Sequence, residues 1–132
     1  MNLSLSGAYR YFIHSQSTDM RKGLNGLSGI VQNDFQKDPM SGDVFIFLNK
    51  SRNRIKLLHW QGDGFVIYYK CLEKGTFEIP KSDTSGLWLS ITHQELQFIL
   101  DGIVLSSIKK RVRYEPHFVN KMSMELARSA HV

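Results

Sequence analysis

The fold is decided by four segments in a fixed order: TDMRKGLNGL (residues 18–27), DPMSGDVFIFLN (38–49), RIKLLHWQGDGF (54–65) and YYKCLEKGTF (68–77). The first begins a stretch with helical spacing of apolar residues, and the other three have the pattern of β-strands joined by turns. One helix followed by an antiparallel meander is typical of an α+β domain. We therefore expect a meander packed against an N-terminal helix and a short C-terminal helix.

The helix is expected to begin at Ser17 or Thr18, either of which can cap it, and to end before Asp38-Pro39. Its apolar face would consist of Met20, Leu24, Leu27, Ile30, Val31 and Phe35. Three glycines, at positions 23, 26 and 29, each cost such a helix about 1 kcal/mol relative to alanine. They indicate either close packing of a sheet or second copy against the helix, or simply a weak helix held by its apolar face.

The strands are marked by a change of pattern after residue 43. Residues 44–48 form an apolar run typical of a strand buried on both sides, and Gln61–Gly64 is a hairpin turn between strands 54–60 and 65–71. Shorter strands are expected at 9–13, 76–79 and 87–91. Thr92 and Glu95 form a capping box for a short helix that ends at Gly102. Residues 1–132 are then one domain, with 104–132 as a basic, partly ordered tail.

Length and composition are those of an ordinary globular domain. The chain has 132 residues, 42% of them hydrophobic and 22% charged, and Cys71 is its single cysteine, so no intrachain disulfide can form. The N-terminus lacks the pattern of a signal peptide, and no apolar run approaches the roughly 20 residues of a membrane span. These features predict a cytoplasmic protein without a membrane partner.

Positive charge is the clearest functional signal. The formal net charge is +5, and the sequence pI is about 9.4. The excess is concentrated in two runs, Lys50–Lys56 and Lys109–Arg113. Such clusters favour anionic partners, nucleic acid before anionic membrane.

Residues able to do chemistry are scattered. The five histidines lack the paired spacing of a metal site, no nucleophile motif is present, and Cys71 has apolar neighbours. Asp38, Asp43 and Asp63 could hold two cations in a nuclease only if the fold brought them together. We therefore expect no enzyme activity, no metal and no cofactor, and keep the carboxylate cluster as an alternative.

Basic and aromatic side chains alternate along the meander. Strand periodicity places Arg54, Lys56 and Trp60 on one face, and Tyr68 with Lys70 on one face of the next strand. Cations can hold phosphates while aromatic rings stack on exposed bases. The other interpretation is that Trp60, Tyr68 and Tyr69 belong to the core or to a dimer interface.

Together these motifs resemble a known family. The segments 18–31, 38–49 and 54–77, followed by the capping-box segment, are similar to the accessory protein TnpB of insertion-sequence family sixty-six, over roughly residues 11–102. The residues that carry the resemblance are Thr18, Asp19, Met20, Arg21, Lys22, Gly23, Asp38, Pro39, Gly42, Arg54, Lys56, Trp60, Asp63, Gly64, Tyr69, Lys70, Leu72, Glu73, Gly75 and Phe77. The basic run 109–113 and the tail to Val132 are not part of this pattern.

The resemblance implies a non-enzymatic protein that assists DNA transposition beside a separate transposase. The expected partners are DNA, the transposase and other element-encoded proteins, with a homo-oligomer as a further option. The predicted nucleic-acid-binding residues are Arg21, Lys22, Arg52, Arg54, Lys56, Lys109, Lys110, Arg111 and Arg113. The alternative function is a protein-interaction adaptor that docks through the glycine-bearing helix or the aromatic sheet face.

Overall fold

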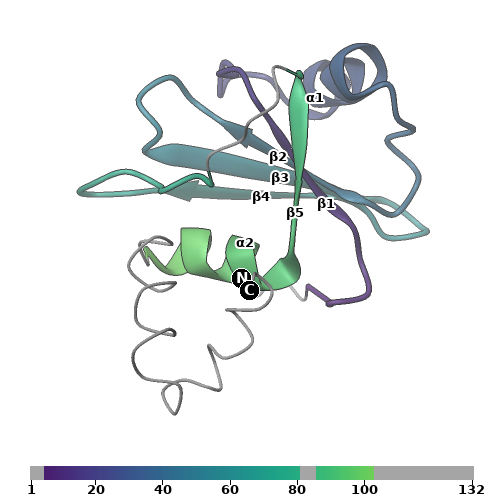
Figure 1. Cartoon of the computed structure of the whole chain (residues 1–132). Coiled ribbons are helices and arrows are strands. Elements are labelled where there is room, and N and C mark those ends of the chain that lie inside the picture. The colour runs from purple at the N-terminus through teal and green to yellow at the C-terminus, as the bar shows by residue number, and fades with distance from the viewer. Residues whose placement is uncertain (1–4, 81–85, 103–132) are drawn as a thin grey trace.

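A computed structural model of the chain describes residues 5–80 and 86–102, which form a five-stranded sheet with one helix on each face (Figure 1). The elements are β1 (Tyr11–His14), α1 (Leu24–Ile30), the π-helical segment η1 (Val31–Phe35), β2 (Val44–Leu48), β3 (Arg54–Trp60), β4 (Phe65–Cys71), β5 (Trp88–Ile91) and α2 (His93–Asp101). The α+β class expected from the sequence is confirmed.

The strand order is β4-β3-β2-β1-β5. The pairs β2·β3 and β3·β4 are antiparallel, as the predicted meander requires, and β5 also runs antiparallel to β1. The pair β1·β2 is parallel. The sheet is therefore mixed, because the segment between β1 and β2 carries α1 across the sheet, and a crossover of this kind returns the chain in the same direction.

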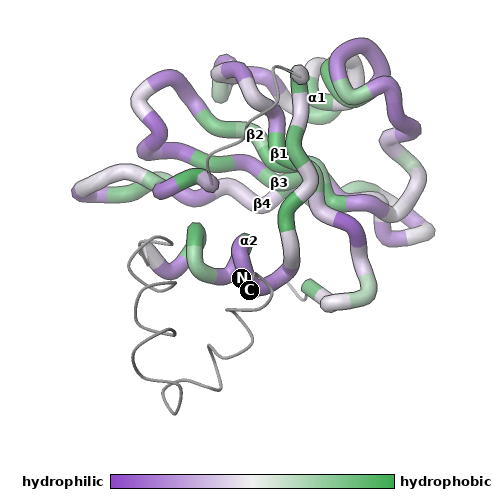
Figure 2. The backbone as a smooth tube through the Cα atoms, in the orientation of Figure 1, coloured by the Kyte–Doolittle hydropathy of each residue, from purple (hydrophilic) through white to green (hydrophobic). Residues whose placement is uncertain are grey.

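The core has two parts, one on each face of the sheet. Strand alternation sends Phe45 and Phe47 of β2 toward Leu27 of α1, which we call the α1 face. The other β2 residues face Leu96 and Ile99 of α2, which we call the α2 face. All five residues of β2 are buried, which confirms the prediction of a strand covered on both sides. Figure 2 shows the apolar residues concentrated in the strands and the polar ones in the connecting loops.

The first helix begins later than the sequence indicates. It starts at Leu24 with Gly23 as N-cap, and residues 18–22 form a turn instead of helix. The turn is held by one long-range hydrogen bond, from Thr18 N–H to Leu48 O at 2.8 Å, and by one of its own, from Lys22 N–H to Asp19 O at 3.1 Å. The prediction of a helix from residue 17 or 18 is therefore wrong, because long-range hydrogen bonds fix this segment in another conformation.

Lys56 makes the second attachment of the same turn. Its Nζ donates to Met20 O at 2.8 Å and to Lys22 O at 2.9 Å. The side chain is only 8% exposed, so the ammonium group lies between β3 and the turn. Two backbone carbonyls that belong to no helix or strand thus receive hydrogen bonds from a cation, which is a stronger donor than a neutral group.

The structure confirms the predicted capping of α2 but not the predicted strand at residues 76–79. The capping box of α2 is confirmed, since Thr92 Oγ1 accepts from Glu95 N–H at 3.0 Å and Gly102 ends the helix with φ of 78°. Residues 76–79 are not a strand: Phe77 N–H donates to Arg52 O, and the ring is buried on the α2 face. A Cβ on Gly29 would meet nothing within 4 Å, and the three atoms nearest to one on Gly26 would all belong to the Lys22 side chain. Close packing of another element therefore does not explain these glycines within the described residues.

No helix among residues 5–80 and 86–102 is long and apolar enough to cross a membrane.

We predict that Lys56→Met lowers the free energy of unfolding by about 1–3 kcal/mol, because it leaves two carbonyls without their charged donor while keeping most of the apolar stem. Urea denaturation followed by circular dichroism measures the change. The matched control is Lys74→Met at an exposed position, where a change within about 0.5 kcal/mol is expected. Equal stability of Lys56→Met and the unmodified protein would contradict the anchoring role.

Candidate nucleic-acid interface

A shallow cleft of about 580 Å³ lies where three separate segments meet at the α1 face, and we call it the basic cleft. The turn before α1, the β2–β3 loop and the adjoining strands β3 and β4 each supply part of its wall. Its lining residues are Ser17, Thr18, Asp19, Met20, Arg21, Asn49, Lys50, Ser51, Arg54 and Tyr69. Three of these residues are cations. Arg21 comes from the turn before α1, Lys50 from the β2–β3 loop and Arg54 from the start of β3.

The β2–β3 loop is a tight turn organised by one asparagine. Asn49 Oδ1 accepts from the N–H groups of Asn53 and Arg54 at 3.0 and 2.9 Å, and its Nδ2 donates to Asn53 Oδ1 at 2.7 Å. Arg52 closes the loop in the left-handed region, with φ of 56°. The exposed Lys50 is therefore carried on a hydrogen-bonded scaffold beside the turn that bears Arg21.

Tyr69 forms the aromatic side of the cleft. It lies opposite Lys56 in the β3·β4 register, and the Lys56 Nζ sits 4.7 Å from the centre of its ring. Its hydroxyl accepts a hydrogen bond of 3.2 Å from Arg54 Nη1, and this bond raises the pKa of Arg54. With 44% of its surface exposed, the ring is held between two cations and still reachable from solvent.

Arg21 is paired within its own turn. Its Nη2 donates to Asp19 Oδ2 at 2.7 Å, and its backbone N–H donates to Asp19 Oδ1 at 2.9 Å. The side-chain hydrogen bond from Arg21 is the main cause that lowers the pKa of Asp19 to about 2. The Arg21 guanidinium is 91% exposed, so the pair is screened by water and an external anion can reach the cation.

The structure separates the sequence-predicted residues into groups. Arg21 and Arg54 line the basic cleft, and Lys22 is exposed beside it without lining it. Lys56 shares the face of Arg54, as alternation predicts, but its ammonium group is turned inward beneath the cleft. Arg52 lines a neighbouring pocket. Lys109, Lys110, Arg111 and Arg113 lie outside the described residues.

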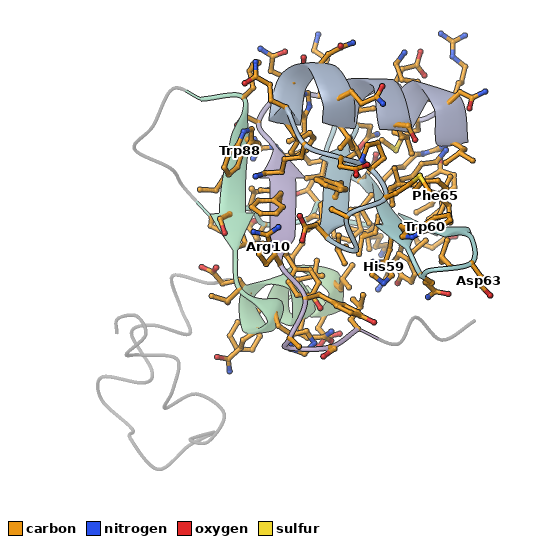
Figure 3. All side chains as sticks on the ribbon, turned by 90° about the vertical axis from the view of Figure 1, so that its right-hand side faces the viewer. Arg10, His59, Trp60, Asp63, Phe65 and Trp88 are labelled. Carbon is orange, nitrogen blue, oxygen red and sulfur yellow. The ribbon has the colours of Figure 1, made fainter. Side chains whose placement is uncertain are left out.

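Two residues of the cleft were absent from the predicted set. Lys50 belongs to the basic run 50–56, so the charge pattern could have identified it. Tyr69 was considered only as a core or interface aromatic, because strand periodicity does not show that Arg54 reaches across to its hydroxyl. Trp60, in contrast, packs edge to face with Phe65 at 4.9 Å at the far end of the hairpin, away from the cleft (Figure 3).

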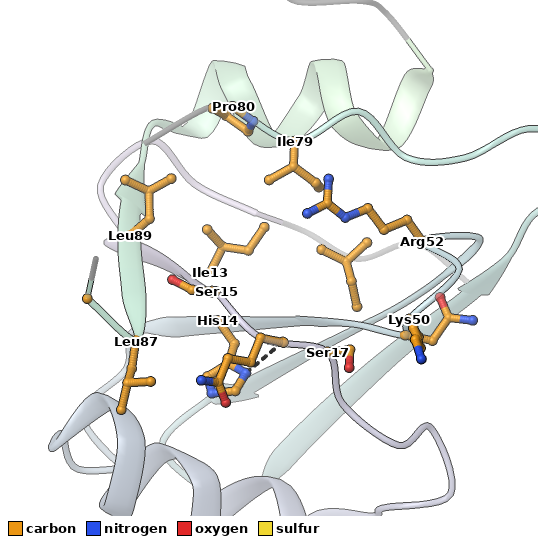
Figure 4. A pocket seen from close by; sticks show the side chains of 14 residues that line it. Ile13, His14, Ser15, Ser17, Lys50, Arg52, Ile79, Pro80, Leu87 and Leu89 are labelled. Atoms are coloured by element: carbon orange, nitrogen blue, oxygen red, sulfur yellow. Dashed lines mark hydrogen bonds between the residues drawn. The ribbon is translucent and has the colours of Figure 1, made fainter. Parts of the chain in front are cut away.

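The neighbouring pocket has a different character (Figure 4). It measures about 650 Å³, and Ile13, Leu48, Ile79, Leu87 and Leu89 supply the apolar part of a lining that also includes Ser15, Gln16 and Asn49. Lys50 and Arg52 stand at one side, and none of its lining residues is acidic. His14 in its wall is already engaged, with Nδ1 at 2.9 Å from Gln16 O and Nε2 at 2.8 Å from Asp34 Oδ2.

The three aspartates of the nuclease alternative have separate surroundings. Asp43 is buried and forms a bidentate pair with Arg10 at 2.9 and 3.0 Å. Asp38 Oδ1 accepts from Met40 N–H, and Asp63 points outward at the tip of the β3–β4 hairpin (Figure 3). Within the part of the chain that the structure describes, no three His, Cys, Asp or Glu side chains gather as a metal site. Cys71, expected among apolar neighbours, is exposed at the end of β4.

The Asp19–Arg21 pair predicts an NMR titration. Because the folded-state pKa is lowered, the stabilisation is present above the ordinary carboxyl pKa near 3.8 and is lost as the pH falls toward about 2. The carboxyl carbon of Asp19 should therefore titrate near pH 2, and Arg21→Ala should move the midpoint part of the way back to the ordinary value, because the backbone N–H at position 21 still donates to the carboxylate. An ordinary midpoint in the unmodified protein would contradict the pair.

Comparison with known proteins identifies the family of the chain. The family model described as IS66 Orf2 like protein matches residues 9–110. Among curated proteins of Sinorhizobium fredii, the uncharacterized protein y4jC is 30% identical over 106 residues, which cover 80% of this chain and 89% of the relative. The uncharacterized protein y4hO is 31% identical over 94 residues, covering 71% and 80%. No solved structure matches the chain. Since the family model covers both helices, all five strands and every residue of the basic cleft, the chain belongs to the IS66 Orf2-like family.

Proposed function

We propose that this transposition accessory protein acts without catalysis of its own, by binding DNA in the basic cleft. The observation that carries the proposal is the convergence of Arg21, from the turn before α1, with Lys50 and Arg54, from the distant β2–β3 segment, around one exposed tyrosine ring. A net charge of +5 adds a general attraction to polyanions.

The chemistry of the cleft favours phosphate contacts. Two guanidinium groups can each give paired hydrogen bonds to phosphate oxygens, and Lys50 adds a point charge. Contacts of this kind position a protein on the DNA backbone without reading sequence. The Tyr69 ring offers a stacking surface for a base that is not paired, because part of the ring remains exposed between its two cations. We therefore expect weak sequence preference and strong salt dependence.

Lys56 contributes to this function indirectly. Its two hydrogen bonds to the turn fix the position of Arg21, and its charge lies under the Tyr69 ring. It takes no part in phosphate binding in this proposal, because its ammonium group is buried. Of the four cations in the basic run 50–56, Lys50 and Arg54 therefore face the proposed ligand, Arg52 lines the neighbouring pocket, and Lys56 holds the turn in place.

The adaptor function is the second candidate, and the pocket beside the cleft, with its apolar wall, favours it. A side chain of a partner protein could enter between Leu48 and Leu89, with an adjacent carboxylate near Arg52. Association with the purified transposase in the absence of DNA, lost on Leu89→Asp and unaffected by Arg54→Ala, would favour this candidate over DNA binding.

Fluorescence anisotropy with a labelled oligonucleotide at several salt concentrations tests DNA binding. Each of Arg21→Ala and Arg54→Ala should weaken binding several-fold and reduce the slope of log K against log salt by about 0.7–0.9, the value of one lost phosphate contact.

Two matched variants make this test specific. Lys74→Ala removes one charge at an exposed position outside the cleft, so its salt slope should stay within error of the unmodified protein. Asp19→Asn should act in the opposite direction and tighten binding, because it removes the carboxylate that competes for Arg21. Binding that is insensitive to both cleft arginines, or equally sensitive to Lys74, would contradict the proposal.

A further inference from the structure

Among the residues that the structure describes, strand β4 is an open edge of the sheet. The strand order places it at one end and β5 at the other, and Figure 3 shows the two on opposite sides of the molecule. All seven residues of β4 pair with β3, and no strand among residues 5–80 and 86–102 pairs with the other side of β4.

The hydrogen bonds at both ends of the hairpin identify the unpaired backbone groups. Leu72 N–H donates to Asn53 O, and Gln61 N–H donates to Gly64 O, so the even-numbered positions of β4 exchange hydrogen bonds with β3. In an antiparallel ladder these positions alternate along the strand. The N–H and C=O groups of four residues therefore point outward, those of Phe65, Ile67, Tyr69 and Cys71.

Within the part of the chain that the structure describes, β4 lacks most of the usual protections of an edge strand. Natural edges are shortened, bulged, covered by a helix or loop, or guarded by proline or by charged side chains, including inward-pointing ones. β4 has seven residues, no proline, and an unbroken register with β3 in which no residue has positive φ. Its one charge, Lys70, donates from Nζ to Leu100 O at 2.9 Å and so is turned toward α2. The opposite edge, β5, has only four residues.

We propose that β4 pairs antiparallel with β4 of a second copy of this chain, with Tyr68 on the two-fold axis. In this register Phe65 lies opposite Cys71 of the second copy, and Ile67 lies opposite its Tyr69. All four outward residues of each copy then exchange hydrogen bonds with outward residues of the other copy. If the register of the two β4 strands were shifted by two positions, one outward residue of each copy would lie opposite a residue beyond the end of the other strand. Lys70 lies opposite Val66, so no like charges meet within the paired strands.

The pairing has a consequence for the basic cleft. Phe65, Ile67 and Tyr69 all face the α1 side of the sheet, and directly opposite residues of paired strands share a face. The two Tyr69 side chains would lie diagonally across the axis, about 8 Å apart at the backbone. Two basic clefts would thus adjoin on one side of a ten-stranded sheet. This consequence rests on the proposed function, and the dimer itself does not.

Disulfide trapping tests the register. Phe65→Cys places a thiol opposite the natural Cys71 of the second copy, at a Cα separation of about 5.5 Å that suits a disulfide. Mild oxidation should give a covalent species of twice the 15.2 kDa chain mass. The unmodified protein should give none, because its two Cys71 residues would be six positions apart, about 20 Å. Phe65→Cys with Cys71→Ser should also give none.

Light scattering and a second cysteine variant test the dimer independently of Phe65→Cys. Light scattering of the unmodified protein at about 150 mM salt, where surface charges are largely screened, should report twice the chain mass. If Phe65→Cys does not fold, Tyr68→Cys in a Cys71→Ser background should cross-link to itself across the axis. A single-chain mass at all concentrations up to about 100 µM, or a dimer that neither cysteine variant traps, would overturn the proposal. Anisotropy titration of the same samples separates the two ideas, since a monomer that binds DNA through Arg54 leaves the proposed function intact.

Discussion

The ammonium group of Lys56 joins strand β3 to the turn before α1, and the basic cleft depends on this attachment. Its two hydrogen bonds tie residues 20–22 to the middle of β3. Without them the turn would keep the bond from Thr18 N–H to Leu48 O, the packing of Met20 against the α1-face core and its own internal contacts. A buried lysine is costly unless its donors are satisfied, so this position couples the site to the stability of the whole domain.

Lys56 therefore has two roles: it binds the turn before α1, and it contacts the Tyr69 ring. From below, its charge lies against the Tyr69 ring, and on the outer side Arg54 donates to the hydroxyl of the same tyrosine. The cleft above contains Arg21, Lys50 and Arg54 within one surface, which concentrates positive potential where the ring is exposed. A site of this kind is suited to a polyanion with planar groups, and the position of Arg21 within it depends on the buried lysine.

Local patterns were sufficient for most of the fold. Continuous apolar character identified β2, alternation placed Arg54 and Lys56 on one face of β3, and Thr92 with Glu95 marked the start of α2. The start of α1 was missed because Thr18 is a good cap in isolation, whereas the carbonyls of Met20 and Lys22, which would accept helical hydrogen bonds, accept instead from Lys56, far away in sequence. The parallel pairing of β1 with β2 likewise depends on a crossover that periodicity does not show.

The candidate site was less predictable than the fold, for a related reason. Charge runs identified Arg54 and could have identified Lys50, but they do not separate a lysine that reaches solvent from one that hydrogen-bonds to carbonyls of another segment. That distinction requires the position of residues 20–22, which are 34–36 positions before Lys56.

Backbone amide NMR during titration with a short DNA tests the central claim most directly. The account predicts saturable shift changes concentrated in residues 17–21 and 49–51, and at Arg54 and Tyr69, all of which line the basic cleft. Binding that leaves these amides unchanged, or that shifts only residues of β5 and α2, would contradict it.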